Sequence, residues 1–295
     1  MLNPELSLHR RLPDRIARNG ALASLAERYQ PLIRSLRDAG GAPVKNLLNG
    51  TVLGHPLHPV ITDIPVGAWS VTALLDVLEM TGREDVAFAA DAALGFGLLG
   101  GVGAIVTGYA DWADTDKEPR TLGMAHAALN ASAFGAYCGS LLLRRSGRRQ
   151  AGIALSMLGY AISGFAAYLG GELAYNFLLG TKHTAEPLEP PQTFVPVLAD
   201  DELPVGQMRR VDAAGIPVLL LRTHDALHAM SAVCTHRGAP LDRGTLEDGT
   251  CVRCPWHGSV FSFEDGSVIE GPATYPQARF EARVSDGRIE VRSLV

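Results

Sequence analysis

The chain has 295 residues, which is room for two domains, and its formal net charge at pH 7 is −5. A charge this modest and acidic argues against a general affinity for nucleic acid. The mean hydropathy of +0.11 averages two unlike parts, because residues 60–180 contain long stretches almost free of charge and residues 193–295 are polar. We therefore expect a multi-domain protein.

The N-terminal part, residues 1–50, contains an amphipathic pattern. Apolar residues recur at three- and four-residue steps, at Leu22, Leu25, Tyr29, Leu32 and Leu36. This spacing predicts a helix, interrupted near Pro31. Arginines between the apolar positions suit a helix lying at the headgroup level of a membrane, and packing on protein is the alternative.

Four apolar runs follow, at about 60–80, 86–110, 122–143 and 151–171. Each can cross roughly 30 Å of hydrocarbon at about 1.5 Å per residue. The third and fourth runs contain no Asp, Glu, Lys or Arg. A soluble bundle needs a polar face on each helix, and these two runs have no charged face. Residues 51–180 are therefore predicted to form an all-α transmembrane four-helix bundle.

Histidines mark the edge of this region. Gly54-His55-Pro56-Leu57-His58-Pro59 precedes the first run, and His126 begins the third. With this His-Pro signature, residues 50–180 resemble a bacterial family of small four-helix membrane proteins of unknown function. Polar groups beside a span are costly and suggest a site. His55, His58 and His126 are candidate ligands of a haem b or a metal ion, and helix capping or hydrogen bonding is the alternative.

Two short runs in the last quarter carry the strongest signal, Cys234-Thr235-His236 and Cys254-Pro255-Trp256-His257. Each run supplies one thiol and one imidazole. Structural zinc sites usually pair Cys with Cys and His with His in their spacing. One Cys and one His per run suits a [2Fe–2S] centre with thiolates on one iron and imidazoles on the other.

The residues around these runs extend the signal. Cys234-Thr-His-Arg-Gly-Ala-Pro-Leu241 and Cys254-Pro-Trp-His-Gly-Ser-Val-Phe261 resemble the two cluster loops of the Rieske family. The resemblance covers residues 193–295 and implies that Cys234 and Cys254 hold the inner iron, with His236 and His257 on the outer one. The positions of the bridged cysteines in respiratory members are Ala239 and Trp256 here, which is similar to the soluble ferredoxin subclass.

The same resemblance names groups around the cluster. Ser259, after Gly258, is expected to donate a hydrogen bond to a bridging sulfide, and Gly271-Pro272-Ala273 resembles the proline loop that covers the cluster. Phe261 stands where high-potential members often have Tyr. We therefore expect a reduction potential in the lower half of the family's range of roughly −150 to +300 mV. Arg237, Arg243 and Arg253 flank the loops, either as a docking rim or as solvated charges.

Short alternating apolar runs from residue 193 on, separated by turns such as Asp265-Gly266 and Asp286-Gly287, independently predict strands. The fold expected is a transmembrane four-helix bundle followed by a small all-β Rieske domain at 193–295. A Pro-containing linker at 181–192 would join the two.

We expect an electron-transfer protein or oxidoreductase component that carries single electrons between a redox partner protein and a membrane redox centre or quinone. A ferredoxin-like component of an oxygenase system and a non-catalytic membrane-tethered redox sensor are the alternatives. The expected location is a bacterial cell membrane. The arginines at 144–149 and the basic N-terminal fifty residues point to opposite orientations, and we favour a cytoplasmic cluster.

Overall fold

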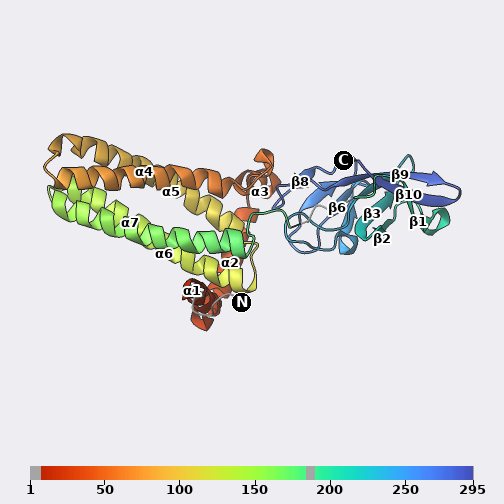
Figure 1. Ribbon diagram of the computed structural model, residues 1–295, viewed down its shortest axis with the longest axis horizontal. Coiled ribbons are helices and arrows are strands. Elements are labelled where there is room, and N and C mark those ends of the chain that lie inside the picture. The colour runs from red at the N-terminus through yellow and green to blue at the C-terminus, as the bar shows by residue number, and fades with distance from the viewer. Residues whose placement is uncertain (1–7, 184–189, 295) are drawn as a thin grey trace. The chain divides into compact units, whose positions relative to one another are not determined.

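The computed structural model describes residues 8–183 and 190–294 and divides the chain into two compact units (Figure 1). The helical unit comprises the chain as far as Ala39 together with Leu57–Leu179. The β unit comprises Gly40–Pro56 and the chain from Gly180 on. Half of the linker predicted at 181–192 lies outside the described residues, which omit 184–189.

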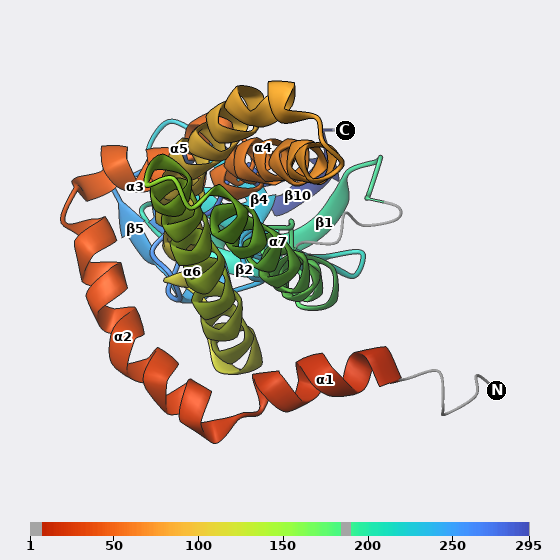
Figure 2. The same ribbon diagram turned by 90° about the vertical axis from the view of Figure 1, so that its left-hand side faces the viewer.

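The helical unit contains α1 (Leu8–Ala17), α2 (Gly20–Asp38), α4 (Leu57–Met80), α5 (Ala87–Trp112), α6 (Lys117–Arg145) and α7 (Arg149–Gly171), with short turns η3 (Glu84–Val86) and η4 (Glu172–Asn176). Helix α4 packs along α5, and α6 packs along α7. Helix α2 lies against α5 and α6 on the outside of this bundle (Figure 2). The predicted helical region is thus confirmed, with more helices than the four expected.

The two helix pairs meet through aromatic side chains. Trp69 of α4 stacks on Tyr137 of α6 with ring centroids 4.1 Å apart. Gly97 of α5 faces the Trp69 indole, where a Cβ atom would collide with the ring, and a Cβ on Gly101 would lie 3.0 Å from the Phe134 ring of α6. Small residues at these positions let the helices approach closely, which is how helices pack in lipid without a hydrophobic drive.

Five ionisable side chains of the bundle form one network of ion pairs inside it. Arg144 and Asp76 are fully buried and lie 2.5 Å apart, and Arg144 also contacts Asp91 at 3.1 Å. Arg149 pairs with Glu79 and, at 3.0 Å, with Asp91. Charges within membrane segments normally face the bundle interior and pair with one another, and this network follows that rule.

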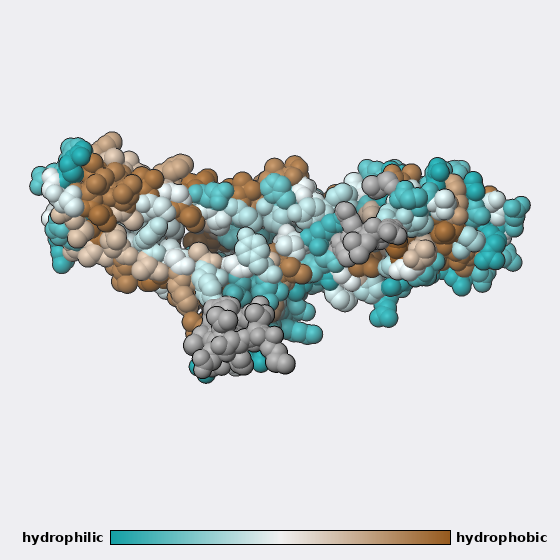
Figure 3. Space-filling view, viewed as in Figure 1, coloured by the Kyte–Doolittle hydropathy of each residue, from teal (hydrophilic) through white to brown (hydrophobic). Residues whose placement is uncertain are grey.

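Three of the described helical segments are long and apolar enough to cross a membrane: Leu57–Met80, Glu84–Trp112 and Arg149–Asn176. Helix α6, predicted as the third span, is not among them, because polar and small residues such as His126 and Asn130 lower its hydropathy. Figure 3 shows hydrophobic residues gathered on the surface of the helical unit. Phe88 and Leu99 are 85% and 74% exposed there, as residues that face lipid would be.

Helix α2 runs without interruption through Pro31, contrary to the expected break. Its polar face is buried, because Gln30 donates to the Thr115 carbonyl at 2.7 Å and Arg37 pairs with Asp114. Its apolar stripe is exposed, at Leu25, Tyr29, Leu32 and Leu36. Leu22, the first residue of the predicted pattern, packs against the cluster around Leu122, and the exposure of the other four positions favours the headgroup alternative.

The β unit is an antiparallel all-β domain with two sheets. The six-stranded sheet has the order β1 (Val195–Ala199), β10 (Arg288–Ser293), β9 (Arg279–Ser285), β4 (Leu227–Ser231), β3 (Ile216–Arg222), β2 (Met208–Ala213). The four-stranded sheet has the order β5 (Thr245–Glu247), β6 (Cys251–Arg253), β7 (Val260–Ser262), β8 (Val268–Glu270). Short helical turns η5 (Asp200–Glu202) and η6 (Leu241–Arg243) join strands. The unit also contains α3 (Gly41–Asn49) and η2 (Thr51–Leu53).

Candidate metal centre

The two predicted cluster loops leave the β unit as matching turns. The first follows β4, and the second connects β6 to β7. In each, the cysteine N–H donates to the carbonyl five residues further on, at 2.8 Å for both Cys234 and Cys254. Gly238 and Gly258 donate back to those cysteine carbonyls, and both have φ of +73°, which favours glycine. The two loops therefore have the same turn conformation around Cys234 and Cys254.

These turns bring the four predicted ligands together. Cys234 and Cys254 are buried, at 1% and 3% exposure, within one apolar cluster of the β unit. His236 and His257 are half-buried, with ring centroids 4.9 Å apart and an edge-on angle of 88°. The thiols thus lie inside and the imidazoles nearer to solvent, which is the order that the family resemblance implies.

A hydrogen bond joins the two thiols and favours the thiolate form of Cys254. The Cys234 thiol donates to Cys254, and the amides of Trp256 and His257 also point to that sulfur. Against the opposing effect of burial, these hydrogen bonds lower the pKa of Cys254 to about 6. The same contact with Cys254, together with burial, raises the pKa of Cys234. Backbone N–H groups at a sulfur stabilise its negative charge, as iron ligation requires.

The donor set fits a [2Fe–2S] centre. Within the described residues, no group of three or more His, Cys, Asp or Glu side chains is gathered to hold a metal ion. The site instead offers a thiol pair and an imidazole pair, one for each iron of a Rieske centre. Such a centre, when bound, supplies reversible one-electron transfer.

The predicted proline loop is tied to both cluster loops. Ser259 is fully buried, and its Oγ accepts a hydrogen bond from the Ala273 N–H at 2.9 Å. The Ser259 hydroxyl proton is not used in that bond. Thr235 donates to the Tyr275 carbonyl at 2.7 Å. Pro272, directly before Ala273, is buried.

Arg253 has a role that the sequence analysis did not assign. It donates to the Gly258 carbonyl at 2.8 Å and pairs with Glu247 at 2.7 Å and Glu270 at 3.2 Å. Arg253, whose side chain is 35% exposed, thus connects the second cluster loop to β5 and β8. A signal is present in the sequence, since Glu247 and Arg253 flank Asp248-Gly249, a residue pair typical of a hairpin turn.

The three candidate histidines of the N-terminal half divide between the units. His55 belongs to the β unit, is exposed, and its Nδ1 lies 3.1 Å from the Pro56 carbonyl. His58 and His126 belong to the helical unit. The Nδ1 of His58 lies 3.3 Å from Thr107 Oγ1, and His126 donates to the Ala166 carbonyl at 2.8 Å.

Comparisons with known proteins agree with this geometry. Residues 193–281 match the family model of the Rieske [2Fe–2S] domain, and residues 54–183 match a predicted membrane protein family, DUF2231. Ferredoxin CarAc from Metapseudomonas resinovorans is 36% identical over 101 residues, which are 34% of this chain and 94% of that protein. Apoptosis-inducing factor 3 from Homo sapiens is 33% identical over 135 residues, which are 43% of this chain.

Among solved structures, the chain is similar to one described as the complex of reduced oxygenase and oxidized ferredoxin in carbazole 1,9a-dioxygenase. The identity is 35%, the coverage is 34% of this chain and 94% of the other, and the TM-score is 0.32. The chain spans only 21% of the length of the human Apoptosis-inducing factor 3.

The chain therefore belongs to the Rieske [2Fe–2S] family, with a DUF2231 membrane protein domain on the N-terminal side of the Rieske domain. Both family resemblances predicted from the sequence are confirmed.

Proposed function

We propose that this protein carries single electrons at a membrane, between a redox partner protein and a membrane redox centre or quinone. The observation that supports this most directly is the layered ligand set, with buried Cys234 and Cys254 and half-buried His236 and His257. Electrons would enter and leave through the imidazole edge. Trp256, 57% exposed beside His257, gives that edge an apolar contact for a partner.

The residues of the site suit reversible transfer. Neutral imidazole ligands leave less negative charge on a cluster than thiolates do and raise its potential above that of an all-thiolate ferredoxin. The apolar surroundings of the two cysteines, which include Phe261 and Phe263, exclude water from the inner side. Ser259 and the loop amides supply hydrogen bonds that set the potential further.

Absorption and electron paramagnetic resonance spectra of the full-length protein in detergent, before and after dithionite, test the proposal. We expect a Rieske-type signal that appears on reduction. Protein that binds zinc alone after iron and sulfide reconstitution, with no such signal, would overturn it.

A ferredoxin-like component of an oxygenase system is the second candidate. Its support is the relative Ferredoxin CarAc, of which this chain covers 94%. The two candidates differ in the oxidant of the reduced cluster. Reduced protein in liposomes would be mixed rapidly with a short-chain quinone or with a Rieske oxygenase. Oxidation by the quinone alone supports the first candidate, and oxidation by the oxygenase alone supports the second.

For the location, we propose a bacterial cell membrane with the cluster on the cytoplasmic side. Residues 1–50 carry eight Lys and Arg against four Asp and Glu, which favours their retention inside. The arginines at 144–149 favour the opposite orientation, but two of them have a structural role, because Arg144 and Arg149 pair with buried carboxylates. A C-terminal green fluorescent protein fusion should fluoresce, and an active alkaline phosphatase fusion at the same point would contradict this orientation.

A haem b in the helical unit is a separate hypothesis. Its candidate ligands are now His58 and His126, because His55 belongs to the β unit. Its support is that the Nδ1 of each ring has a partner, which would leave Nε2 for iron. Against it, Asn130 Nδ2 lies 3.1 Å from His126 Nε2, an arrangement expected of a structural histidine. A haem absorption band lost in both His58→Ala and His126→Ala would support the hypothesis, and purified protein without a band would end it.

A further inference from the structure

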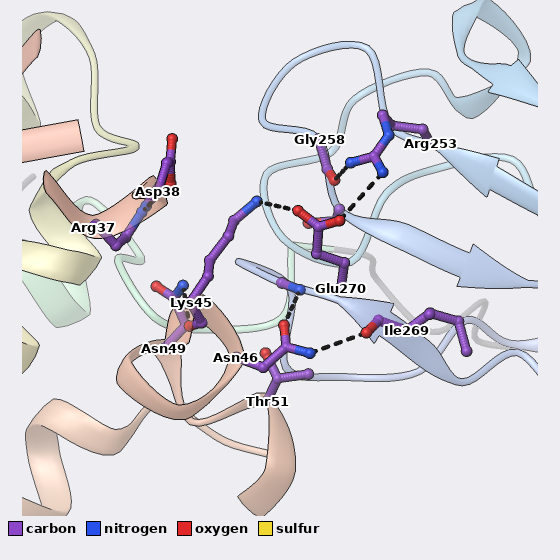
Figure 4. A network of polar contacts seen from close by, with 12 residues as sticks. Arg37, Asp38, Lys45, Asn46, Asn49, Thr51, Arg253, Gly258, Ile269 and Glu270 are labelled. Atoms are coloured by element: carbon purple, nitrogen blue, oxygen red, sulfur yellow. Dashed lines mark hydrogen bonds and ion pairs between the residues drawn. The ribbon is translucent and has the colours of Figure 1, made fainter. Parts of the chain in front are cut away.

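A short segment outside both family matches completes the β unit. Residues 41–53, here called the clamp segment, comprise α3 and η2 and precede the DUF2231 match at 54–183. They nevertheless belong to the same compact unit as the Rieske domain. Figure 4 shows how their side chains reach β8 and the proline loop that follows it.

Asn46 is the central contact of the clamp segment. Its side-chain N–H donates to the Ile269 carbonyl at 3.0 Å, and its Oδ1 accepts from the Gly271 N–H at 2.8 Å. Strand β8 is the edge of its sheet, so these backbone groups have no further strand to pair with. One amide side chain therefore satisfies both groups where β8 runs into the proline loop.

Thr51 holds the same loop two residues further on. Its hydroxyl donates to the Ala273 carbonyl at 3.1 Å, while the Ala273 N–H donates to Ser259. Ala273 is thus fixed from one side by the clamp segment and from the other by the second cluster loop. A Cβ on Gly271 would lie 2.7 Å from Thr51 Oγ1, so this close approach depends on glycine.

A chain of charges runs parallel to these hydrogen bonds. Lys45 pairs with Glu270 at 3.0 Å, and Glu270 pairs with Arg253 at 3.2 Å. Arg253 in turn donates to the Gly258 carbonyl, next to the predicted ligand His257. Lys45 is thereby connected to the second cluster loop through two ion pairs and one hydrogen bond (Figure 4).

We propose that the clamp segment holds the proline loop closed over the cluster site, with Asn46 and Thr51 as positioning residues for Ala273 and Ser259. Retention of the cluster and its reduction potential then depend on residues that lie before the first membrane helix. The redox part of this proposal rests on the proposed function, whereas the closure of the loop does not.

The test uses the full-length protein in detergent and matched variants. Thr51→Val keeps the shape of the side chain without its hydroxyl, and Thr51→Ser restores the hydroxyl. Asn46→Ala removes both contacts of the amide, and Leu47→Ala alters the exposed neighbouring residue on α3 as a control. The measurements are hydrogen exchange of peptides covering 268–276, the rate of iron loss to a chelator, and the potential and paramagnetic resonance signal.

We expect Thr51→Val to accelerate exchange in 268–276 and iron loss by roughly two- to tenfold, the range given by the net free energy of one hydrogen bond, and Asn46→Ala, which removes two, to accelerate them more. Both variants should also shift the potential, while Thr51→Ser and Leu47→Ala stay close to the wild type. Unchanged exchange in Thr51→Val and Asn46→Ala would overturn the clamp. Because exchange is measurable without iron, changed exchange in a protein that binds no cluster would overturn the proposed function and leave the closure intact.

Discussion

Gly271 donates its backbone N–H to the side-chain oxygen of Asn46 at 2.8 Å, across 225 positions of the sequence. This bond joins the start of the proline loop to a helix that precedes the whole membrane region. Gly271 therefore has two constraints, since its N–H must reach Asn46 and its missing side chain leaves room for Thr51.

Gly271→Ala is expected to open the clamp, because the added methyl group would meet Thr51 Oγ1. Hydrogen exchange in 268–276 and iron loss should both accelerate. The double variant Gly271→Ala/Thr51→Ala removes the obstructing side chain, so its defect should be smaller than the sum of the two single defects. Simple additivity in a double-mutant cycle would show that the two residues do not interact.

Cys254→Ser should abolish the iron–sulfur signal, because the site then lacks a buried thiolate. Cys251→Ser, three residues earlier, is the matched control and should retain the signal, since Cys251 is a free thiol in β6 outside the ligand set. Paramagnetic resonance and iron content check both variants. A signal lost only in Cys251→Ser would require a different ligand assignment.

The wild-type potential is expected in the lower half of roughly −150 to +300 mV. Ser259→Ala should lower it by about 20–60 mV, because a hydrogen bond worth roughly 0.5–1.5 kcal/mol to the reduced cluster is lost and a tenfold change corresponds to about 59 mV for one electron. Redox titration of both proteins measures this. An unchanged potential in Ser259→Ala would mean that its hydroxyl does not bond the cluster.

Glu270 gives the β unit a pH-dependent contribution to stability. Burial alone would raise the pKa of this carboxyl, but Lys45 and Arg253 outweigh it and hold the pKa below its ordinary value of 4.5. A lowered folded-state pKa stabilises the protein above pH 4.5, and the contribution is lost as pH falls through the lowered value.

Glu270→Gln should therefore cost about 1–2 kcal/mol at pH 5–8, between the values of exposed and buried ion pairs. The difference from the wild type should shrink below pH 4.5. Denaturant unfolding in detergent at several pH values measures it. A difference that grows on acidification would contradict this sign.

Arg144→Met should destabilise the helical unit by about 3–5 kcal/mol, because it leaves the fully buried Asp76 without its charged partner. Adding Asp76→Leu should recover much of the loss, since both buried charges are then gone. Arg145→Met is the control, because that neighbouring side chain is exposed. Thermal unfolding in detergent compares the four proteins, and equal effects of Arg144→Met and Arg145→Met would contradict the buried pair.

The parts of this protein that could be predicted from sequence are local in the chain. The cluster ligands lie in two runs of three and four residues, and the Asp286-Gly287 turn between β9 and β10 was predicted from its residue types alone. The uncharged run at 122–143 likewise identified the core of α6, although the ends of that helix are charged.

The contacts that sequence analysis missed join distant residues of ordinary type. Nothing about Asn46 or Thr51 distinguishes them from solvated helix and turn residues, because their partners are backbone groups more than 200 positions away. The partner of Asp76 could not be predicted either, since its pairing with Arg144 depends on which helices pack together. Hydrophobic periodicity fixes the faces of a helix but not the neighbour that covers each face.

The contacts of the clamp segment also bear on whether the chain crosses the membrane an odd or an even number of times. Residues 40–56 fold into one unit with residues 180–183 and 190–294, so in a protein that spans a membrane all of them must lie on the same side. An odd number of passages through the bilayer between them is thereby excluded. Three apolar helices can then all cross only if α6 crosses as well, and its 29 residues span about 43 Å, enough for the passage.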